Sequence, residues 1–107
     1  MKHFVTFGLL LAMATPVLGQ SGSNTAELKA YEAVQSRMRD MTMKPMGEPD
    51  KDFAMMMIPH HQAAIDMAKI QIQYGKDSML IKMANDVIAS QEKEIETLKS
   101  WQSRNQK

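Results

Sequence analysis

Apolar residues recur at helical spacing along most of this chain, and two breaks divide that pattern into three runs. The first break is the stretch "TMKPMGEP" at residues 42–49, where two prolines and a glycine end any helix. The second is Gly75, which follows a long central run. No segment alternates between apolar and polar residues as a strand would. The sequence therefore predicts an all-α fold with helices at about 25–41, 49–74 and 78–103.

Local signals support the ends of these helices. Asn24 and Glu27 have the spacing of a capping box at the start of the first helix. Pro49 suits the first turn of the second helix. Asp77 or Ser78 is suited to cap the third.

Pro59 lies inside the second run and cannot donate a hydrogen bond to the carbonyl of Met55. Two arrangements satisfy this: one helix that bends, or two helices broken at Ile58–Pro59. The apolar period continues through the proline and favours one bent helix.

Short connections between three helices predict an antiparallel helical bundle related to four-helix bundles. Cysteine is absent, so no disulfide can stabilise so small a chain. Stability must come from helix packing, a bound metal or a second copy. We therefore expect that a homodimer could complete a four-helix or larger bundle.

The chain begins with "MKHFVTFGLLLAMATPVLGQ", a short basic start followed by an apolar run and small residues. This pattern predicts a signal peptide at residues 1–19, cleaved after Gly19, because the apolar run is short for a membrane span. Residues 20–24 are expected to form a flexible leader, and residues 25–107 a methionine-rich helical domain. The mature protein would then be periplasmic or otherwise exported, with no membrane attachment.

Charge argues against polyanionic partners. Loss of Lys2 with the signal peptide would leave equal numbers of basic and acidic side chains. Nucleic acids and anionic membranes both require a basic surface, so neither is an expected partner.

Methionine is the unusual component, with 12 residues in the chain. The densest cluster is "MMMIPHHQAAIDMA" at residues 55–68, which also contains two adjacent histidines. Helical spacing places Met56, Met57, His60 and Met67 on one face, with His61 on its shoulder. Thioether and imidazole together suit copper, and thioether favours Cu(I). Imidazole must lose its proton to bind a metal, so the affinity of such a site should fall below about pH 6.5.

A second cluster, "MRDMTMKPM", places Met38, Met41, Met43 and Met46 together at the end of the first helix, and the last three are the candidate ligands. Methionines in a loop gain little from packing, so a second or extended metal site is one interpretation. The other is that they fold back under the end of the bundle. A structural role is also the simpler explanation for any single methionine or histidine, and only the combination favours metal. Gln91 or Asp66 is a candidate for an outer hydrogen bond to an imidazole, although a bond from Gln91 to the backbone or a partner helix is the simpler alternative.

Two stretches together resemble a known family. The run Met57-Ile58-Pro59-His60-His61, then Ala64 and Met67-Ala68, and downstream Ala84, Ile88, Gln91, Glu94-Ile95 and Trp101, is similar to the CopM-like family of exported, ferritin-like helical copper proteins. The resemblance covers residues 52–101. It implies a periplasmic helical bundle that binds copper through Met and His and contributes to copper tolerance, with other periplasmic copper-handling proteins as partners.

The sequence therefore predicts a copper-binding protein, not an enzyme, that buffers or carries Cu(I), with Cu(II) and Ag(I) as further candidates. The predicted ligands are His60, His61, Met56, Met57 and Met67, with Met41, Met43 and Met46. One alternative is a periplasmic chaperone or adaptor that uses a methionine-rich surface without metal. Another is a ferritin-like di-metal enzyme, which requires Glu three residues before His. Met57 and Ile58 occupy those positions, which disfavours it.

Overall fold

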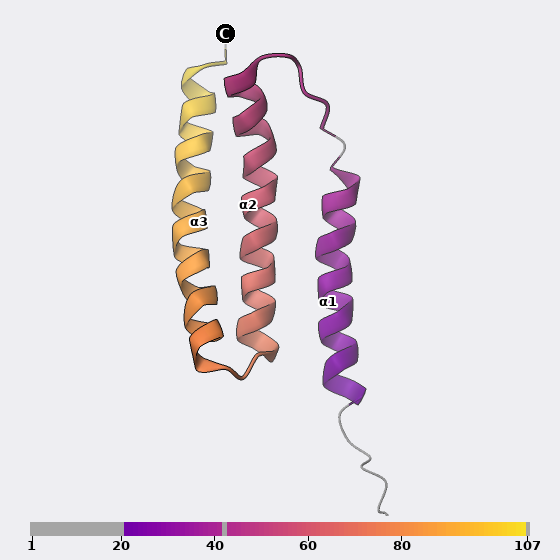
Figure 1. The fold of residues 1–107 in the computed structure, drawn as a ribbon. Coiled ribbons are helices and arrows are strands. Elements are labelled where there is room, and N and C mark those ends of the chain that lie inside the picture. The colour runs from indigo at the N-terminus through magenta and orange to yellow at the C-terminus, as the bar shows by residue number, and fades with distance from the viewer. Residues whose placement is uncertain (1–20, 42, 107) are drawn as a thin grey trace, which may run out of the picture.

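The computed structural model describes residues 21–41 and 43–106 and contains three helices in that part of the chain (Figure 1). Helix α1 spans Ser21–Asp40, α2 spans Pro49–Tyr74 and α3 spans Ser78–Arg104. Those residues include no strand, so the all-α prediction is confirmed. The signal peptide expected at residues 1–19 lies outside the described residues.

The ends of two helices agree with the sequence signals. Helix α2 begins at Pro49 and ends at Tyr74, as predicted. Asp77 caps α3, and its carboxylate accepts a hydrogen bond from the backbone N–H of Leu80 at 2.9 Å. A Cβ on Gly75 would lie 2.4 Å from the backbone oxygen of Gln71, so only glycine fits where the chain leaves α2.

Helix α1 differs from its prediction because it begins at Ser21, four residues before the expected start. Residues 21–24 therefore belong to the helix and are not a leader. The first turn of a helix leaves its backbone N–H groups without intrahelical partners, so weak helix formers such as Ser and Gly are tolerated there. The capping-box spacing at Asn24 and Glu27 did not mark the helix start.

Helix α2 continues through Pro59, so the prediction of one helix, in place of two, is confirmed. The proline removes one backbone hydrogen bond without ending the helix. Helical spacing is thereby maintained from Phe53 to Tyr74, and it fixes which residues of α2 share a face.

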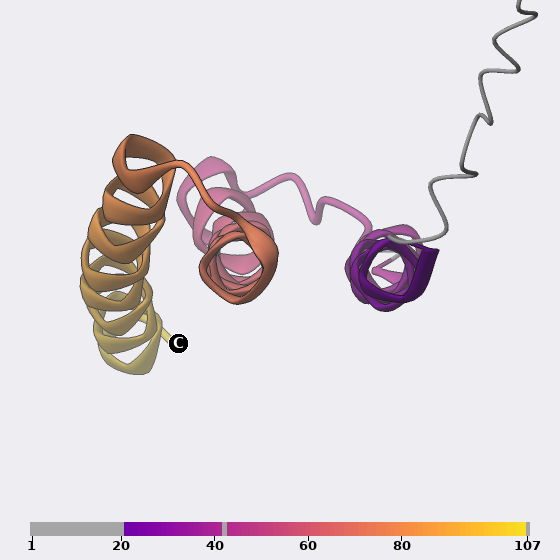
Figure 2. The ribbon, with the colours of Figure 1, turned by 90° about the horizontal axis from the view of Figure 1, so that it is seen from below.

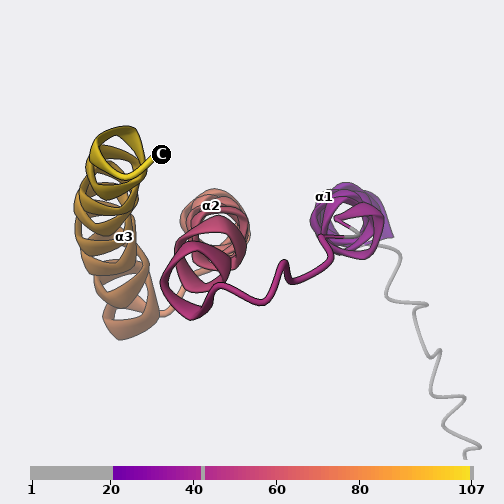
Figure 3. The ribbon, with the colours of Figure 1, turned by 90° about the horizontal axis from the view of Figure 1, so that it is seen from above.

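The helices lie side by side in one layer, with α2 in the middle (Figures 2 and 3). Helix α2 packs against both neighbours, whereas α1 and α3 make no direct helix contact. Against α1 the core is small and consists of Val34, Ala63 and Ile70, with Tyr31 and Tyr74 beside it. An antiparallel bundle is therefore observed, but as a row of helices that leaves both broad faces of α2 open.

Candidate metal-binding site

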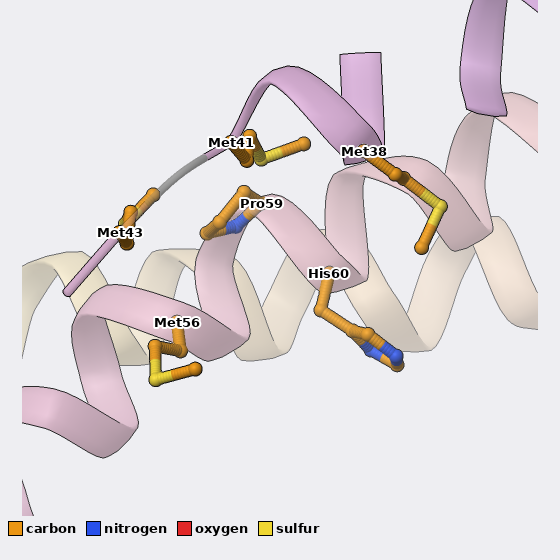
Figure 4. Close-up of a pocket in the computed structure, with 6 residues that line it drawn as sticks. All are labelled: Met38, Met41, Met43, Met56, Pro59 and His60. Atoms are coloured by element: carbon orange, nitrogen blue, oxygen red, sulfur yellow. The ribbon is translucent and has the colours of Figure 1, made fainter. Parts of the chain in front are cut away.

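A cavity of about 150 Å³ lies between α1 and α2, where the connection between them crosses the surface. Helix α1 and the connection supply three methionines, and α2 supplies one methionine, one proline and one histidine (Figure 4). The lining residues are Met38, Met41, Met43, Met56, Pro59 and His60. We call this cavity the methionine pocket.

The connection is held against α2 by hydrogen bonds that set the position of the pocket. The Met43 N–H donates to the Met41 carbonyl at 2.9 Å and closes a tight turn directly after α1. Asp52, in the first turn of α2, accepts from the backbone N–H groups of Met46 and Gly47 at 2.8 and 3.1 Å. Gly47 has a φ of 87°, a conformation that glycine adopts most easily. These contacts hold the connection along α2, where Met41 lies beside Pro59 and Met43 lines the same pocket further along (Figure 4).

His60 is the nitrogen donor of the pocket, and its imidazole is exposed. Met56 lies one helical turn before it on the same face of α2. The side chains of His60 and Met38 extend in the same direction from α2 and α1 (Figure 4). The pocket thus gathers one imidazole and four thioethers from two helices and a loop.

His61 is adjacent in sequence but has a different environment. Its side chain is buried against α3, and its Nε2 atom contacts the carboxylate of Glu94. The carboxylate can only accept a hydrogen bond, so Nε2–H is the donor when Glu94 is ionised. Nδ1 of His61 is buried without a hydrogen-bond partner among the described residues. The two imidazole rings are 6.5 Å apart and inclined by 59°, and only His60 lines the methionine pocket.

The remaining predicted ligands lie elsewhere. Met57 is partly buried on α2. Met67 lines a groove between α2 and α3. Met46 lies in a depression with Lys51, Met55 and Trp101. The structure therefore brings together His60, Met41, Met43 and Met56 from the predicted set, and it places His61, Met46, Met57 and Met67 outside that pocket.

Two residues of the site have roles that sequence patterns did not assign. Met38 lines the pocket, and its position one turn before Met41 was the available signal. Glu94 is the carboxylate that contacts His61. Asp66, proposed for that role, instead accepts hydrogen bonds from Arg37 at 2.9 Å and Gln62 at 3.1 Å. Gln91 has its side chain partly buried on α3, and no outer contact from it to an imidazole is seen in the described part of the chain.

The donor set restricts the metals that the pocket suits. In residues 21–41 and 43–106, no group of three or more His, Asp or Glu side chains could together hold a metal ion. Hard cations such as Mg²⁺ and Ca²⁺ require several oxygen ligands, which this pocket lacks. Thioethers with one imidazole match Cu(I), which binds soft donors.

The fold and the site define a class of protein: a small methionine-rich helical bundle with a soft-donor pocket between two of its helices. The model of the family described as "Domain of unknown function (DUF305)" matches residues 11–105, so the chain belongs to that family. An uncharacterized protein of Acanthamoeba polyphaga mimivirus is 41% identical over 51 residues, which are 48% of this chain and 34% of that protein. The match thus spans about a third of that relative's length. In the described residues no helix is both long and apolar enough to cross a bilayer.

Proposed function

We propose that this protein binds Cu(I) in the methionine pocket and, in an exported compartment, buffers or carries the ion. The observation that supports this proposal is that four methionines and His60, from two helices and the connection between them, line one cavity. The resemblance to CopM-like copper proteins, which rests on residues 57–61 and the downstream α3 residues, points the same way. No catalytic step is required for this role.

The donors come from segments that are far apart in sequence, and this matters for how they would hold an ion. Met38 lies in the last turn of α1, Met41 and Met43 lie in the connection, and Met56 and His60 lie on α2. A bound ion would therefore join α1 to the centre of the layer. Thioethers carry no proton, so only His60 would couple binding to pH.

The test is a competition titration of Cu(I) against a chromogenic chelator. Replacement of Met38 and Met41 together by Leu removes two sulfur atoms and nearly conserves side-chain volume. We expect Cu(I) affinity to fall at least about tenfold, which corresponds to about 1.4 kcal/mol.

The matched control is the pair Met46→Leu and Met67→Leu, which removes two thioethers outside the pocket. We expect that variant to bind Cu(I) as the wild type does. Equal affinity of all three proteins would contradict the assignment of the methionine pocket. Loss of affinity in the control alone would move the site to another part of the chain.

The metal-independent chaperone is the second candidate, and one observation favours it. Several large apolar side chains are exposed on α2 and α3, among them Phe53, Met79 and Met83. Flexible methionines adapt to many apolar surfaces. This alternative predicts that the metal-free protein suppresses aggregation of an unfolded client, and that the Leu variants above do so equally well.

A further inference from the structure

One face of α2 carries a coiled-coil repeat that the neighbouring helices cover only in part, chiefly at Tyr74, which packs beside the α1 core. The spacing alternates between four and three residues over three heptads, which is the pattern of two helices that pack along each other. None of its seven positions is charged, and none is fully buried. We call this row the α2 seam; it consists of Phe53, Met57, His60, Ala64, Met67, Gln71 and Tyr74.

The contacts of α2 show that the seam is open. Helix α1 packs on one side of α2, against Ala63 and Ile70. Helix α3 packs on the other side, where Glu94 contacts His61. Between these contacts, Phe53 and Met67 expose 60% and 40% of their surface.

The seam continues into an apolar groove toward α3. Ala64, Met67 and Gln71 form one wall of this groove, and Leu80, Met83 and Val87 of α3 form the other. A helix laid along the seam would also fill the groove, because the groove follows the boundary between α2 and α3.

The exposed area is large enough for a stable contact. The five most exposed apolar side chains of the seam and its borders are Phe53, Met56, Met67, Leu80 and Met83. Together they present on the order of 500 Å² of apolar surface, against about 800 Å² that each partner buries in a stable complex. The less exposed seam residues would supply much of the remainder.

The order of residues in the seam indicates which partner would cover it, namely a second copy of α2. If a second α2 lies antiparallel, with the twofold axis at position 62, the seam residues from Phe53 to Gln71 pair with one another, and Tyr74 lies beyond them opposite Asp50. Phe53 then faces Gln71 of the other copy. Likewise Met57 faces Met67, and His60 faces the small Ala64, so bulky side chains meet smaller or flexible ones.

We propose that a second copy of this chain covers the α2 seam, with the two α2 helices antiparallel and their α2–α3 hairpins joined in a four-helix bundle. The two copies of His60 lie near the twofold axis of this dimer. The proposal does not depend on copper, since it rests on the apolar repeat alone.

Sedimentation equilibrium of the purified chain in excess chelator tests this dimer between about 1 and about 100 µM. We expect the mass of a dimer. Phe53→Glu and Met67→Glu each place a charge in the seam and should weaken association at least about tenfold. Met46→Glu, at a methionine that is 61% exposed and lies outside the seam and its groove, is the matched control and should leave the dimer intact. A monomeric wild type, or dimers unaffected by either seam variant, would overturn the proposal.

Disulfide cross-linking tests the arrangement even if a seam variant unfolds. The natural chain has no cysteine, so each introduced thiol is unique. Phe53→Cys and Gln71→Cys proteins, mixed and oxidised with diamide, should form a mixed disulfide dimer, because antiparallel helices bring these positions together. Each protein alone should not cross-link, since its two thiols would lie about 27 Å apart. Cross-linking of Phe53→Cys with itself, or no mixed product, would refute the antiparallel seam.

These experiments are separable from the copper titration. The dimer is measured without metal, so absence of Cu(I) binding would leave it unaffected. Met38 and Met41 lie outside the seam, so their Leu variants test the pocket whether or not the chain dimerises.

Discussion

The two sides of α2 use adjacent histidines in opposite ways. On the side of the methionine pocket, His60 is exposed and lines a cavity together with four methionines. On the side of α3, His61 is 7% exposed and contacts Glu94. One step along a helix turns a side chain by about 100°, so neighbours in sequence need not share a site. A His-His pair on a helix is thus one exposed position and one packing position.

Under the proposed function, this difference divides the molecule into a side that would bind the ion and a side that holds the fold together. The α1 side has a small core and an open cavity, which are properties expected of a site that takes up and releases an ion. The α3 side has a buried imidazole tied to a carboxylate, and buried Ile95 on the same helix adds to that packing. The predictions below test whether this division is correct.

The largest expected effect concerns folding stability. His61→Ala removes a buried ring and leaves Glu94 without its contact, so the free energy of unfolding should fall by about 2–3 kcal/mol. His60→Ala changes a side chain that is exposed in the single chain and, at protein concentrations where the chain is monomeric, should cost no more than about 0.5 kcal/mol. Urea denaturation of both variants in chelator, followed by helical circular dichroism, measures the difference. Equal losses would mean that the two histidines do not differ in structural role.

For Cu(I) affinity, we expect His60→Ala to have the larger effect and His61→Ala the smaller. His60→Ala removes the only imidazole that lines the pocket and should lower Cu(I) affinity at least about tenfold. His61→Ala should change it less than about threefold, provided the variant is titrated at a temperature where it remains folded. The double variant should bind no more weakly than His60→Ala. A large loss from His61→Ala alone would assign His61 as a ligand and break the division between the two sides.

Acidification should reduce the affinity of the pocket to a similar or smaller degree. A proton competes with the metal for imidazole nitrogen, so Cu(I) binding should weaken when the pH is lowered from about 7.5 to about 5.5. Affinity falls on acidification because the metal binds the neutral imidazole, and protonation lowers the fraction of the ring in that form. The same titration on His60→Ala should be almost independent of pH, because only thioethers remain. A pH-dependent His60→Ala protein would point to another titrating ligand.

Much of the fold could be predicted because local signals determine it. Pro49, Gly75 and Asp77 act on the backbone of their own turns, and the helix ends at these positions match. The start of α1 was missed because Asn24 fits a first turn as well as a cap. The single-layer arrangement was not predictable from three amphipathic segments, since helical spacing shows which residues share a face but not which neighbour covers it.

The site was predictable only in part, for a related reason. Spacing on α2 placed Met56 and His60 on one face, and the structure has both in the pocket. The approach of Met38, Met41 and Met43 depends on how the connection folds back, which hydrogen bonds to Asp52 help to fix. The Glu94 contact with His61 joins positions 33 residues apart, and no local pattern encodes it. Contacts between residues far apart in the chain are therefore the part of the site that local patterns did not predict.

The smallest expected effect tests how α1 is held beside the pocket. Arg37 neighbours Met38 on α1, and its guanidinium forms an ion pair with Asp66 of α2 at 2.9 Å. Both side chains retain contact with solvent, so Arg37→Ala should lower the free energy of unfolding by no more than about 0.5 kcal/mol. If the Val34 core and the connection hold α1 in place, Cu(I) affinity should change less than about twofold. Urea denaturation and the chelator titration measure both quantities, with Lys82→Ala, at the exposed α3 pair with Asp86, as control. A tenfold loss of affinity from Arg37→Ala alone would show that this surface ion pair, more than the apolar core, positions the thioethers of α1.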